Sequence, residues 1–319
     1  MLKIQDLNKS FGKVRALDNL NLEINEGEFF GFVGPNGSGK TTTMKVISGL
    51  LTADSGRVSL DGIDALKEPE ALKRKIGYMP DFFGVYDNLK VKEYMMFYAS
   101  IYGIEGDQAK KTSMELMDLV NLEDKSDVYV DSLSRGMKQR LCLARTLIHD
   151  PKFLILDEPA SGLDPRARYE MKNILKEIKD RGKTILISSH ILPEIAEMCT
   201  NLGIIESGRM VVTGTVDEIL TAKGAYAPIH IKLIGGSAPA IKVLKKNYLV
   251  QNITIMGNDI TVLFNGNDEK ATDLLADLIG NGARVASFSR QEGNLESLFM
   301  EITQKVDIDE DEWDVNGET

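Results

Sequence analysis

A glycine-rich segment at residues 34–41 has the residue types and spacing of a phosphate-binding loop. It follows an apolar stretch and precedes a helical pattern, so its backbone N–H groups would surround phosphate oxygens at a helix N-terminus. Lys40 is predicted to reach the β- and γ-phosphates of a nucleotide, and the Thr41 hydroxyl to ligate Mg²⁺. A chance match in a glycine-rich turn is the alternative, which the placement between strand and helix disfavours. The residues expected to hold the nucleotide here are Gly34, Pro35, Asn36, Gly37, Ser38, Gly39, Lys40, Thr41 and Thr42.

A second segment with residues suited to chemistry is the apolar run at residues 153–156, which is followed by Asp157 and Glu158. Successive strand residues point to opposite sides, so these two carboxylates are expected to have different roles. Asp157 would complete the Mg²⁺ shell, and Glu158 would orient or deprotonate the attacking water. The alternative, two solvated acids at a strand end, fits poorly beside a phosphate loop.

The elements that must position these groups follow a recognisable order. Strands are expected at residues 3–5, 20–24, 29–33, 57–60 and 75–79, with a helix at 41–50. Residues 91–149 have mostly helical periodicity. Beyond them, strands at 153–156 and 184–188 alternate with helices after Pro165 and Pro193. This alternation is typical of parallel strands joined by crossover helices.

The composition changes near residue 220, and residues 223–228 have the composition of a linker. Beyond the linker the expected order is strand 229–234, helix 239–247, strands 250–256 and 260–265, helix 269–280 and strand 284–289. This βαββαβ order predicts a small ferredoxin-like domain. The predicted domains are therefore 1–222 and 227–304, followed by an acidic, disordered tail at 305–319.

The acidity of the chain is concentrated in that tail. The formal net charge of all 319 residues is -10, but residues 1–305 carry only -3. A protein held on nucleic acid by its overall charge is normally basic, so no nucleic-acid partner is expected. The apolar runs are far shorter than the roughly 20 residues that span a bilayer, and the first residues contain no apolar signal core. These features predict an intracellular protein.

Up to about residue 220 the sequence resembles the ATP-binding subunits of ABC transporters. The phosphate loop and the Asp157–Glu158 pair occur in the family's order with four further features. Residues 133–137 are similar to the signature segment of the family, and 161–165 to the loop that contacts an opposing subunit. His190 matches the switch histidine, and Phe11 stands where the family stacks an aromatic ring on adenine.

The resemblance implies a fold and a mechanism. The fold would be α/β, a P-loop NTPase core with antiparallel β and helical subdomains, with the ferredoxin-like α+β domain appended. Two subunits, identical or different, would face each other head to tail, so that Ser134 and Gly136 of one complete the ATP site of the other. Lys40, Glu158 and His190 would be catalytic, with ATP and Mg²⁺ as the cofactors. ATP hydrolysis would power a separate integral membrane permease.

Two departures from the commonest family pattern point to one branch. Arg135 and Met137 replace a glycine and a glutamine of the signature, and Asp81 replaces a glutamine that contacts Mg²⁺. Asp81 is accordingly expected beside the metal, with Thr41 and Asp157. These variants resemble the branch that serves multidrug, sodium, lantibiotic or lipid exporters.

The same resemblance places the permease contact just after Asp81. Aromatic side chains at Phe82, Phe83 and Tyr86 are suited to docking because they bury a large area. The subunit would then be cytoplasmic and peripheral, on the inner face of the cell membrane.

Two other functions compete with this interpretation. One is a soluble ABC-type ATPase without a transport partner, which would work in DNA repair, translation or iron–sulfur assembly. The other is a P-loop kinase that phosphorylates a small molecule. The signature segment and the switch histidine argue against the kinase, which needs neither.

Overall fold

The computed structural model describes residues 1–82, 84, 86, 88–189, 192–222 and 227–290 of the chain. Two compact units are present, Met1–Val216 and Asp217–Thr319. The division falls before the linker expected at 223–228, because helix α8 (Val216–Ala222) groups with the second unit. His190, Phe83, residues 291–304 of the expected second domain and the tail at 305–319 lie outside the described residues.

A six-stranded sheet forms the centre of the first unit, in the order β10-β9-β3-β8-β7-β6. Five of its strands are parallel: β9 (Asn201–Glu206), β3 (Phe29–Val33), β8 (Thr184–Ser188), β7 (Phe153–Asp157) and β6 (Ile76–Met79). Every residue of β3, β7 and β8 is buried, which matches the continuous apolar runs of parallel strands covered on both faces. The sequence patterns predicted neither β9 nor the edge strand β10 (Arg209–Thr215).

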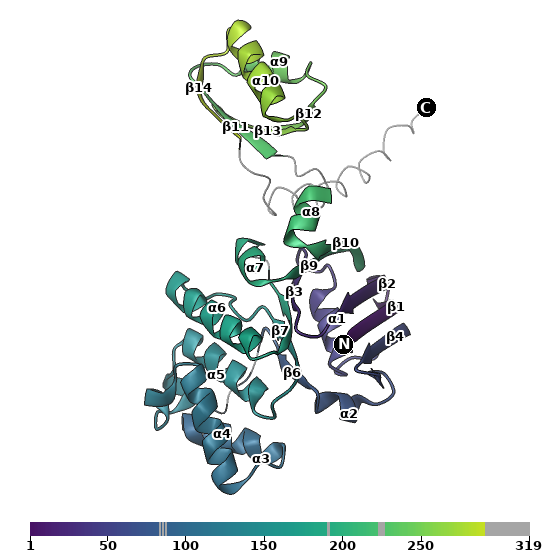
Figure 1. Ribbon diagram of the computed structural model, residues 1–319, viewed down its shortest axis with the longest axis vertical. Coiled ribbons are helices and arrows are strands. Elements are labelled where there is room, and N and C mark those ends of the chain that lie inside the picture. The colour runs from purple at the N-terminus through teal and green to yellow at the C-terminus, as the bar shows by residue number, and fades with distance from the viewer. Residues whose placement is uncertain (83, 85, 87, 190–191, 223–226, 291–319) are drawn as a thin grey trace, which may run out of the picture. The chain divides into compact units, whose positions relative to one another are not determined.

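An antiparallel sheet packs beside this central sheet, in the order β2-β1-β4-β5. Its strands are β2 (Val14–Ile24), β1 (Leu2–Phe11), β4 (Ser55–Leu60) and β5 (Ile63–Asp64). Helix α1 (Lys40–Ile47) lies beside both sheets (Figure 1). It contributes Met44 and Val46 to a core that contains residues of both sheets. The helix ends earlier than the expected residue 50, because the backbone turns at Gly49, where φ is 69°.

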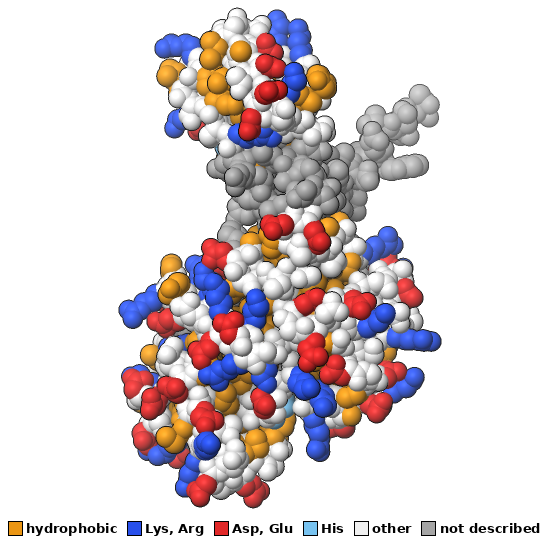
Figure 2. Space-filling model, viewed as in Figure 1, with side chains coloured by type: hydrophobic (Ala, Val, Ile, Leu, Met, Phe, Trp, Pro, Cys, Tyr) orange, Lys and Arg blue, Asp and Glu red, His pale blue; other side chains and the backbone are white. Residues whose placement is uncertain are grey.

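Helices occupy most of the chain between β6 and β7, as the sequence predicts. They are α3 (Val91–Ile101), α4 (Gly106–Leu119) and α5 (Arg135–Leu147), with 3-10 turns at Glu123–Lys125 and Val130–Ser132. The other helices of the first unit are α2 (Pro69–Lys73), α6 (Pro165–Asp180) and α7 (Leu192–Met198). No helix within the described ranges combines the length and the apolar composition needed to cross a bilayer. In Figure 2, acidic and basic side chains are interspersed over the visible surface of this unit.

The second unit contains a four-stranded antiparallel sheet in the order β12-β13-β11-β14. Its elements are β11 (Ala227–Leu233), α9 (Ala238–Leu244), β12 (Val250–Met256), β13 (Asp259–Phe264), α10 (Asp268–Gly280) and β14 (Val285–Arg290). Alternate residues of β11 and β13 pack against α9 and α10, and form an apolar core around Leu274. The element order and the antiparallel pairing are those expected of a ferredoxin-like domain. Ala227 and Pro228 belong to β11 rather than to the expected linker.

Candidate functional site

The phosphate loop connects the buried strand β3 to helix α1, and two of its glycines are sterically required. A Cβ atom on Gly34 would stand 2.3 Å from the carbonyl oxygen of Ile205. Gly39 has a φ of 110°, and its Cβ would stand 2.7 Å from the carbonyl oxygen of Ala16. Larger residues would therefore push the loop out of its conformation, which explains glycine at both positions.

Lys40 opens helix α1 and folds back over its own loop. Its Nζ donates hydrogen bonds to the carbonyl oxygens of Gly34 (2.7 Å) and Pro35 (3.0 Å). Burial lowers the pKa of the ammonium group, and the carboxylates of Glu158 and Asp157 partly offset this effect. The positive charge therefore lies at the loop, with two acids nearby.

Asp157 and Glu158 stand at the carboxyl end of β7, where a third residue connects them. The Ser188 hydroxyl donates to Oδ1 of Asp157 (2.7 Å) and accepts from the backbone N–H of Glu158 (2.9 Å). Ser188 lies opposite Asp157 in the parallel pairing of β7 and β8. Glu158 has a φ of 50°, a left-handed conformation that is unusual for a residue other than glycine. The turn directs its side chain away from the strand and into the pocket.

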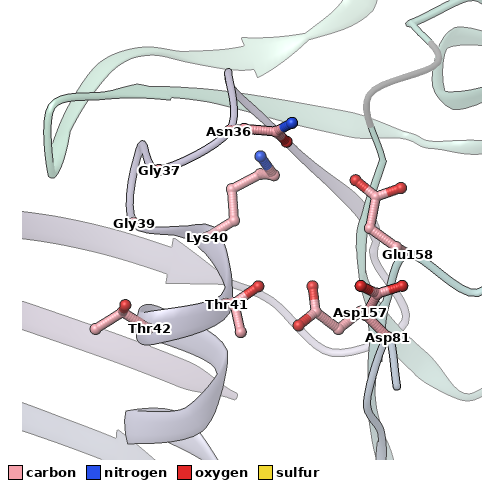
Figure 3. Close-up of a pocket in the computed structure, with 9 residues that line it drawn as sticks. All are labelled: Asn36, Gly37, Gly39, Lys40, Thr41, Thr42, Asp81, Asp157 and Glu158. Carbon is pink, nitrogen blue, oxygen red and sulfur yellow. The ribbon is translucent and has the colours of Figure 1, made fainter. Parts of the chain in front are cut away.

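A pocket of about 180 Å³ brings most of the predicted site together. In Figure 3, Lys40 and the Thr41 hydroxyl face Asp81, Asp157 and Glu158 across it, while the Thr42 side chain points away from the three acids. The pocket is lined by Asn36, Gly37, Gly39, Lys40, Thr41, Thr42, Asp81, Asp157 and Glu158. The phosphate loop therefore lies on one side of the pocket. The side chains of Asp81, Asp157 and Glu158, which together form the carboxylate edge, lie on the other side.

The pocket residues fit a magnesium ion bound together with a nucleotide. Oδ2 of Asp157 is buried and has no hydrogen-bond partner among the described residues, so it retains a lone pair for a ligand. Mg²⁺ takes hard oxygen ligands, usually one or two carboxylates with substrate phosphates and several waters. Within the described part of the chain, no group of three or more His, Cys, Asp and Glu side chains could hold a metal by itself. The site fits an ion that shares its ligands with a bound nucleotide.

Three residues of the phosphate loop that were predicted to hold the nucleotide, Gly34, Pro35 and Ser38, do not line the pocket. Four predicted residues outside the loop are not among the described residues that line it either. Phe11 lies at the end of β1 and is 50% exposed, with the Lys9 ammonium 5.5 Å from its ring centroid. Ser134 caps α5 by accepting from the backbone N–H of Met137 (3.3 Å), and Gly136 lies in the first turn of that helix. The fourth residue, His190, lies outside the described residues.

Two side chains beside the carboxylate edge were not predicted from the sequence. One is Ser188, whose role depends on pairing between strands 31 residues apart. The other is Tyr78 near the end of β6, whose hydroxyl is buried and has no hydrogen-bond partner among the residues that the structure describes. Burial and then the charges of Asp157 and Asp81 raise the pKa of Tyr78, so its hydroxyl keeps its proton at neutral pH. A polar residue at the end of an apolar strand was the only sequence signal for either.

Three comparisons place this geometry among known proteins. A family model described as ABC transporter matches residues 17–161. The linearmycin resistance ATP-binding protein LnrL of Bacillus subtilis (strain 168) is 31% identical over 308 residues, covering 96% of this chain and 99% of that protein. The Nod factor export ATP-binding protein I of Burkholderia pseudomallei (strain 1710b) is 36% identical over 244 residues, covering 75% of this chain and 80% of that protein.

Among solved structures, a dimeric ATP-binding cassette in a post-hydrolysis state, bound to ADP and Pi, is similar to this chain. The TM-score is 0.62 at 26% sequence identity, and the match covers 67% of this chain and 98% of that chain. This match spans the cassette alone, whereas the similarity to LnrL extends over nearly the whole chain.

Proposed function

The chain belongs to the ABC transporter family of ATP-binding proteins, and from this premise we propose that it hydrolyses ATP to drive a separate membrane-embedded exporter. The observation that carries the proposal is the phosphate loop facing Asp157 and Glu158 across one pocket. Phosphoryl transfer depends mainly on positioning and on stabilising charge, and the pocket contains groups for both tasks.

Most of the pocket residues receive a role in this proposal. The backbone N–H groups of the loop and Lys40 bind the β- and γ-phosphates, and Lys40 exchanges its two carbonyl partners for phosphate oxygens. Thr41, Asp157 and Asp81 would hold Mg²⁺, which would neutralise phosphate charge. Glu158 orients the attacking water and accepts its proton, and the Ser188 hydrogen bond fixes the backbone of Glu158.

We further propose that two chains, identical or different, form the complete ATP sites. Ser134 and Gly136 at the start of α5 would contact the nucleotide held by the opposing chain, and Phe11 would stack on the adenine. His190 would contact the γ-phosphate. The exposed Ser134 hydroxyl, the N-terminus of α5 and the half-exposed Phe11 ring support these roles.

The permease is proposed to dock near Phe82, Phe83 and Tyr86, which places the chain on the cytoplasmic face of the membrane. Phe82 is 90% exposed and Tyr86 is 53% exposed, and the Tyr86 ring contacts Phe97 of α3 edge to face at 5.3 Å. Tyr86 and Phe97, which is 40% exposed, form a contiguous exposed apolar surface, and such surfaces mark sites of protein contact.

Magnesium dependence tests the proposed metal ligands. We expect hydrolysis by the purified chain to require Mg²⁺, and Asp157→Asn to raise the Mg²⁺ concentration needed for half-maximal turnover. Asp150→Asn is the matched control, because Asp150 pairs with Lys183 away from the pocket. Equal Mg²⁺ requirements in all three proteins would refute the assignment of Asp157.

Co-purification in mild detergent tests the transport role. We expect an integral membrane protein to accompany the wild-type chain, and Phe82→Ala combined with Tyr86→Ala to reduce its yield. Tyr169→Ala is the control, since Tyr169 is 62% exposed on helix α6 and lies outside the proposed docking segment. An active ATPase with which no integral membrane protein co-purifies would favour the soluble ABC-type ATPase instead.

A further inference from the structure

Residues 161–164 follow the Asp157–Glu158 edge and lie against the first turns of α5 in the same chain. The backbone N–H of Ser161 donates to the carbonyl oxygen of Glu158 (3.0 Å). The carbonyl oxygen of Ser161 accepts from Nε2 of Gln139 on α5 (3.1 Å). Two hydrogen bonds thus connect the backbone of Glu158 to the helix that begins with Ser134 and Gly136.

Gln139 is an unexpected residue for its position. It is only 3% exposed, and its Oε1 is buried with no hydrogen-bond partner in the described part of the chain. An unpaired buried carbonyl oxygen destabilises the folded state, so an aliphatic residue would suit this part of the core better. The contact that glutamine provides and leucine could not is the hydrogen bond to Ser161.

Arg135 makes a second contact with the same loop. Gly162 has a φ of 67°, and a Cβ atom built on it would stand 2.5 Å from Cζ of Arg135 and 2.6 Å from both Nη atoms. The three similar distances place the flat face of the guanidinium over the position that a side chain at residue 162 would occupy. A side chain at position 162 would displace this group, so the arginine and the glycine are matched.

Helix α5 also approaches the start of α6 closely. A Cβ atom on Gly136 would stand 3.2 Å from Cβ of Ala167 and 3.4 Å from Cδ2 of Leu163. Asp164 caps α6 by accepting from the backbone N–H of Ala167 (2.9 Å). The loop is therefore held at both ends, by Glu158 on one side and by the capped helix on the other.

We propose that Gln139 and Arg135 are positioning residues that hold residues 161–164, and through Ser161 the backbone of Glu158, at a fixed distance from the start of α5. This inference rests on the proposed function, in which Glu158 serves the ATP of its own chain while Ser134 and Gly136 contact the ATP of the opposing chain. The contacts of Gln139 and Arg135 with residues 161–164 then couple the two ATP sites through a single chain. Displacement of α5 by the opposing nucleotide shifts Glu158 by way of Ser161.

Gln139→Leu is the decisive variant. It removes the donor to Ser161 and also the unpaired Oε1, so we expect the Tm to stay unchanged or to rise. We expect kcat to fall about tenfold, because small displacements of a catalytic group have effects of this size or larger. The affinity for ATP should stay within about twofold of wild type, since the phosphate loop is untouched, and any cooperativity in ATP should decrease. Lys138→Ala, on the same helix, is the matched control and should behave as wild type.

A pair of variants tests the contact between Arg135 and Gly162. Gly162→Ala alone should reduce kcat, because the new methyl group displaces the guanidinium. Arg135→Gly also removes the contact with Gly162, but it opens space for that methyl group. The loss of kcat in the double variant should therefore be smaller than the combined losses of the two single variants. Additive losses would show that the two residues act independently.

The outcomes separate this inference from the proposed function. A wild-type chain without ATPase activity overturns the proposed function and the inference with it. An active wild type whose Gln139→Leu variant keeps the wild-type kcat and cooperativity overturns the inference alone. A fall in kcat that accompanies a matching fall in Tm and in ATP affinity indicates a merely structural role, and also overturns it. The Arg135 and Gly162 variants provide the same decision if Gln139→Leu does not fold.

Discussion

The two compact units of this chain differ in the buried polar side chains and in the strained backbone conformations that they contain. Among the described residues, every buried polar or charged side chain lies between positions 18 and 189, in the first unit. The residues other than glycine with a positive φ, Glu158 among them, also belong to that unit. In the described part of the second unit, the buried side chains are apolar and the positive φ values occur at glycines.

Part of this difference lies at the pocket, which the buried side chains of Lys40 and Asp157 and the left-handed residue Glu158 line. Buried polar atoms without partners, such as Oδ2 of Asp157 and Oε1 of Gln139, lower the stability of the first unit. Their retention is understandable where a ligand or a moving loop uses them. The second unit shows no such compromise in its described residues, so its contribution is expected in stability or assembly rather than in ATP chemistry.

Lys40→Ala should have the largest effect on ATP binding and turnover. A small effect would contradict the contrast drawn between the two units. The ammonium group is the buried cation of the phosphate loop, and a hydrogen bond to a charged group contributes about 1.5–3 kcal/mol. We therefore expect ATP affinity to fall about 10- to 100-fold, measured by equilibrium binding, with turnover lost as well. Unchanged affinity would mean that nucleotide binds elsewhere.

Ser188→Ala should reduce turnover by about 10- to 100-fold, a loss that is typical of residues that orient metal ligands. The variant removes the hydroxyl that joins Asp157 to the backbone of Glu158. Steady-state hydrolysis over a range of Mg²⁺ concentrations measures the loss. Ser188→Thr keeps the hydroxyl and should recover part of the activity; equal losses in both variants would argue against the hydrogen bonds.

Leu274→Ala probes the second unit. Leu274 is fully buried at the centre of its core, and such a truncation costs about 2–5 kcal/mol of stability. Thermal unfolding should show an earlier transition, whereas ATP turnover below that transition should match wild type. A marked loss of turnover while the protein stays folded would show that the second unit takes part in the chemistry.

The smallest effects should come from a matched pair of helix caps. Asn267 caps α10 in the second unit, and Asp164 caps α6 in the first. Replacing either residue by alanine costs about 1 kcal/mol of stability. Only Asp164→Ala should also reduce turnover, because Asp164 belongs to the loop that holds Glu158. Equal turnover in the two variants would show that the cap of α6 influences stability alone, like the cap of α10.

Local sequence patterns were sufficient to predict the phosphate loop and the acids at the end of β7. Glycines before a lysine at a helix start, and an apolar run ending in two acids, are specific patterns when they occur together in one chain. The βαββαβ order of the second unit was also predictable, because its strands and helices differ clearly in periodicity. Strands β9 and β10 were missed, although β9 is largely buried.

The contacts that connect these elements could not be predicted in the same way. Ser188 meets Asp157 only through the register of two strands, and Gln139 meets Ser161 across 22 residues. The left-handed backbone of Glu158 likewise depends on partners that are distant in sequence. Such contacts are set by tertiary packing, and a residue's type alone does not reveal them.

The central claim is that Glu158 activates water at a nucleotide held by the phosphate loop. Phosphate release by Glu158→Gln, measured alongside ATP binding by the same protein, tests it most directly. Removing a general base lowers the rate about 10²- to 10⁴-fold, so we expect phosphate release to fall by this factor while ATP binding persists. Full turnover in the Glu158→Gln variant would contradict the claim.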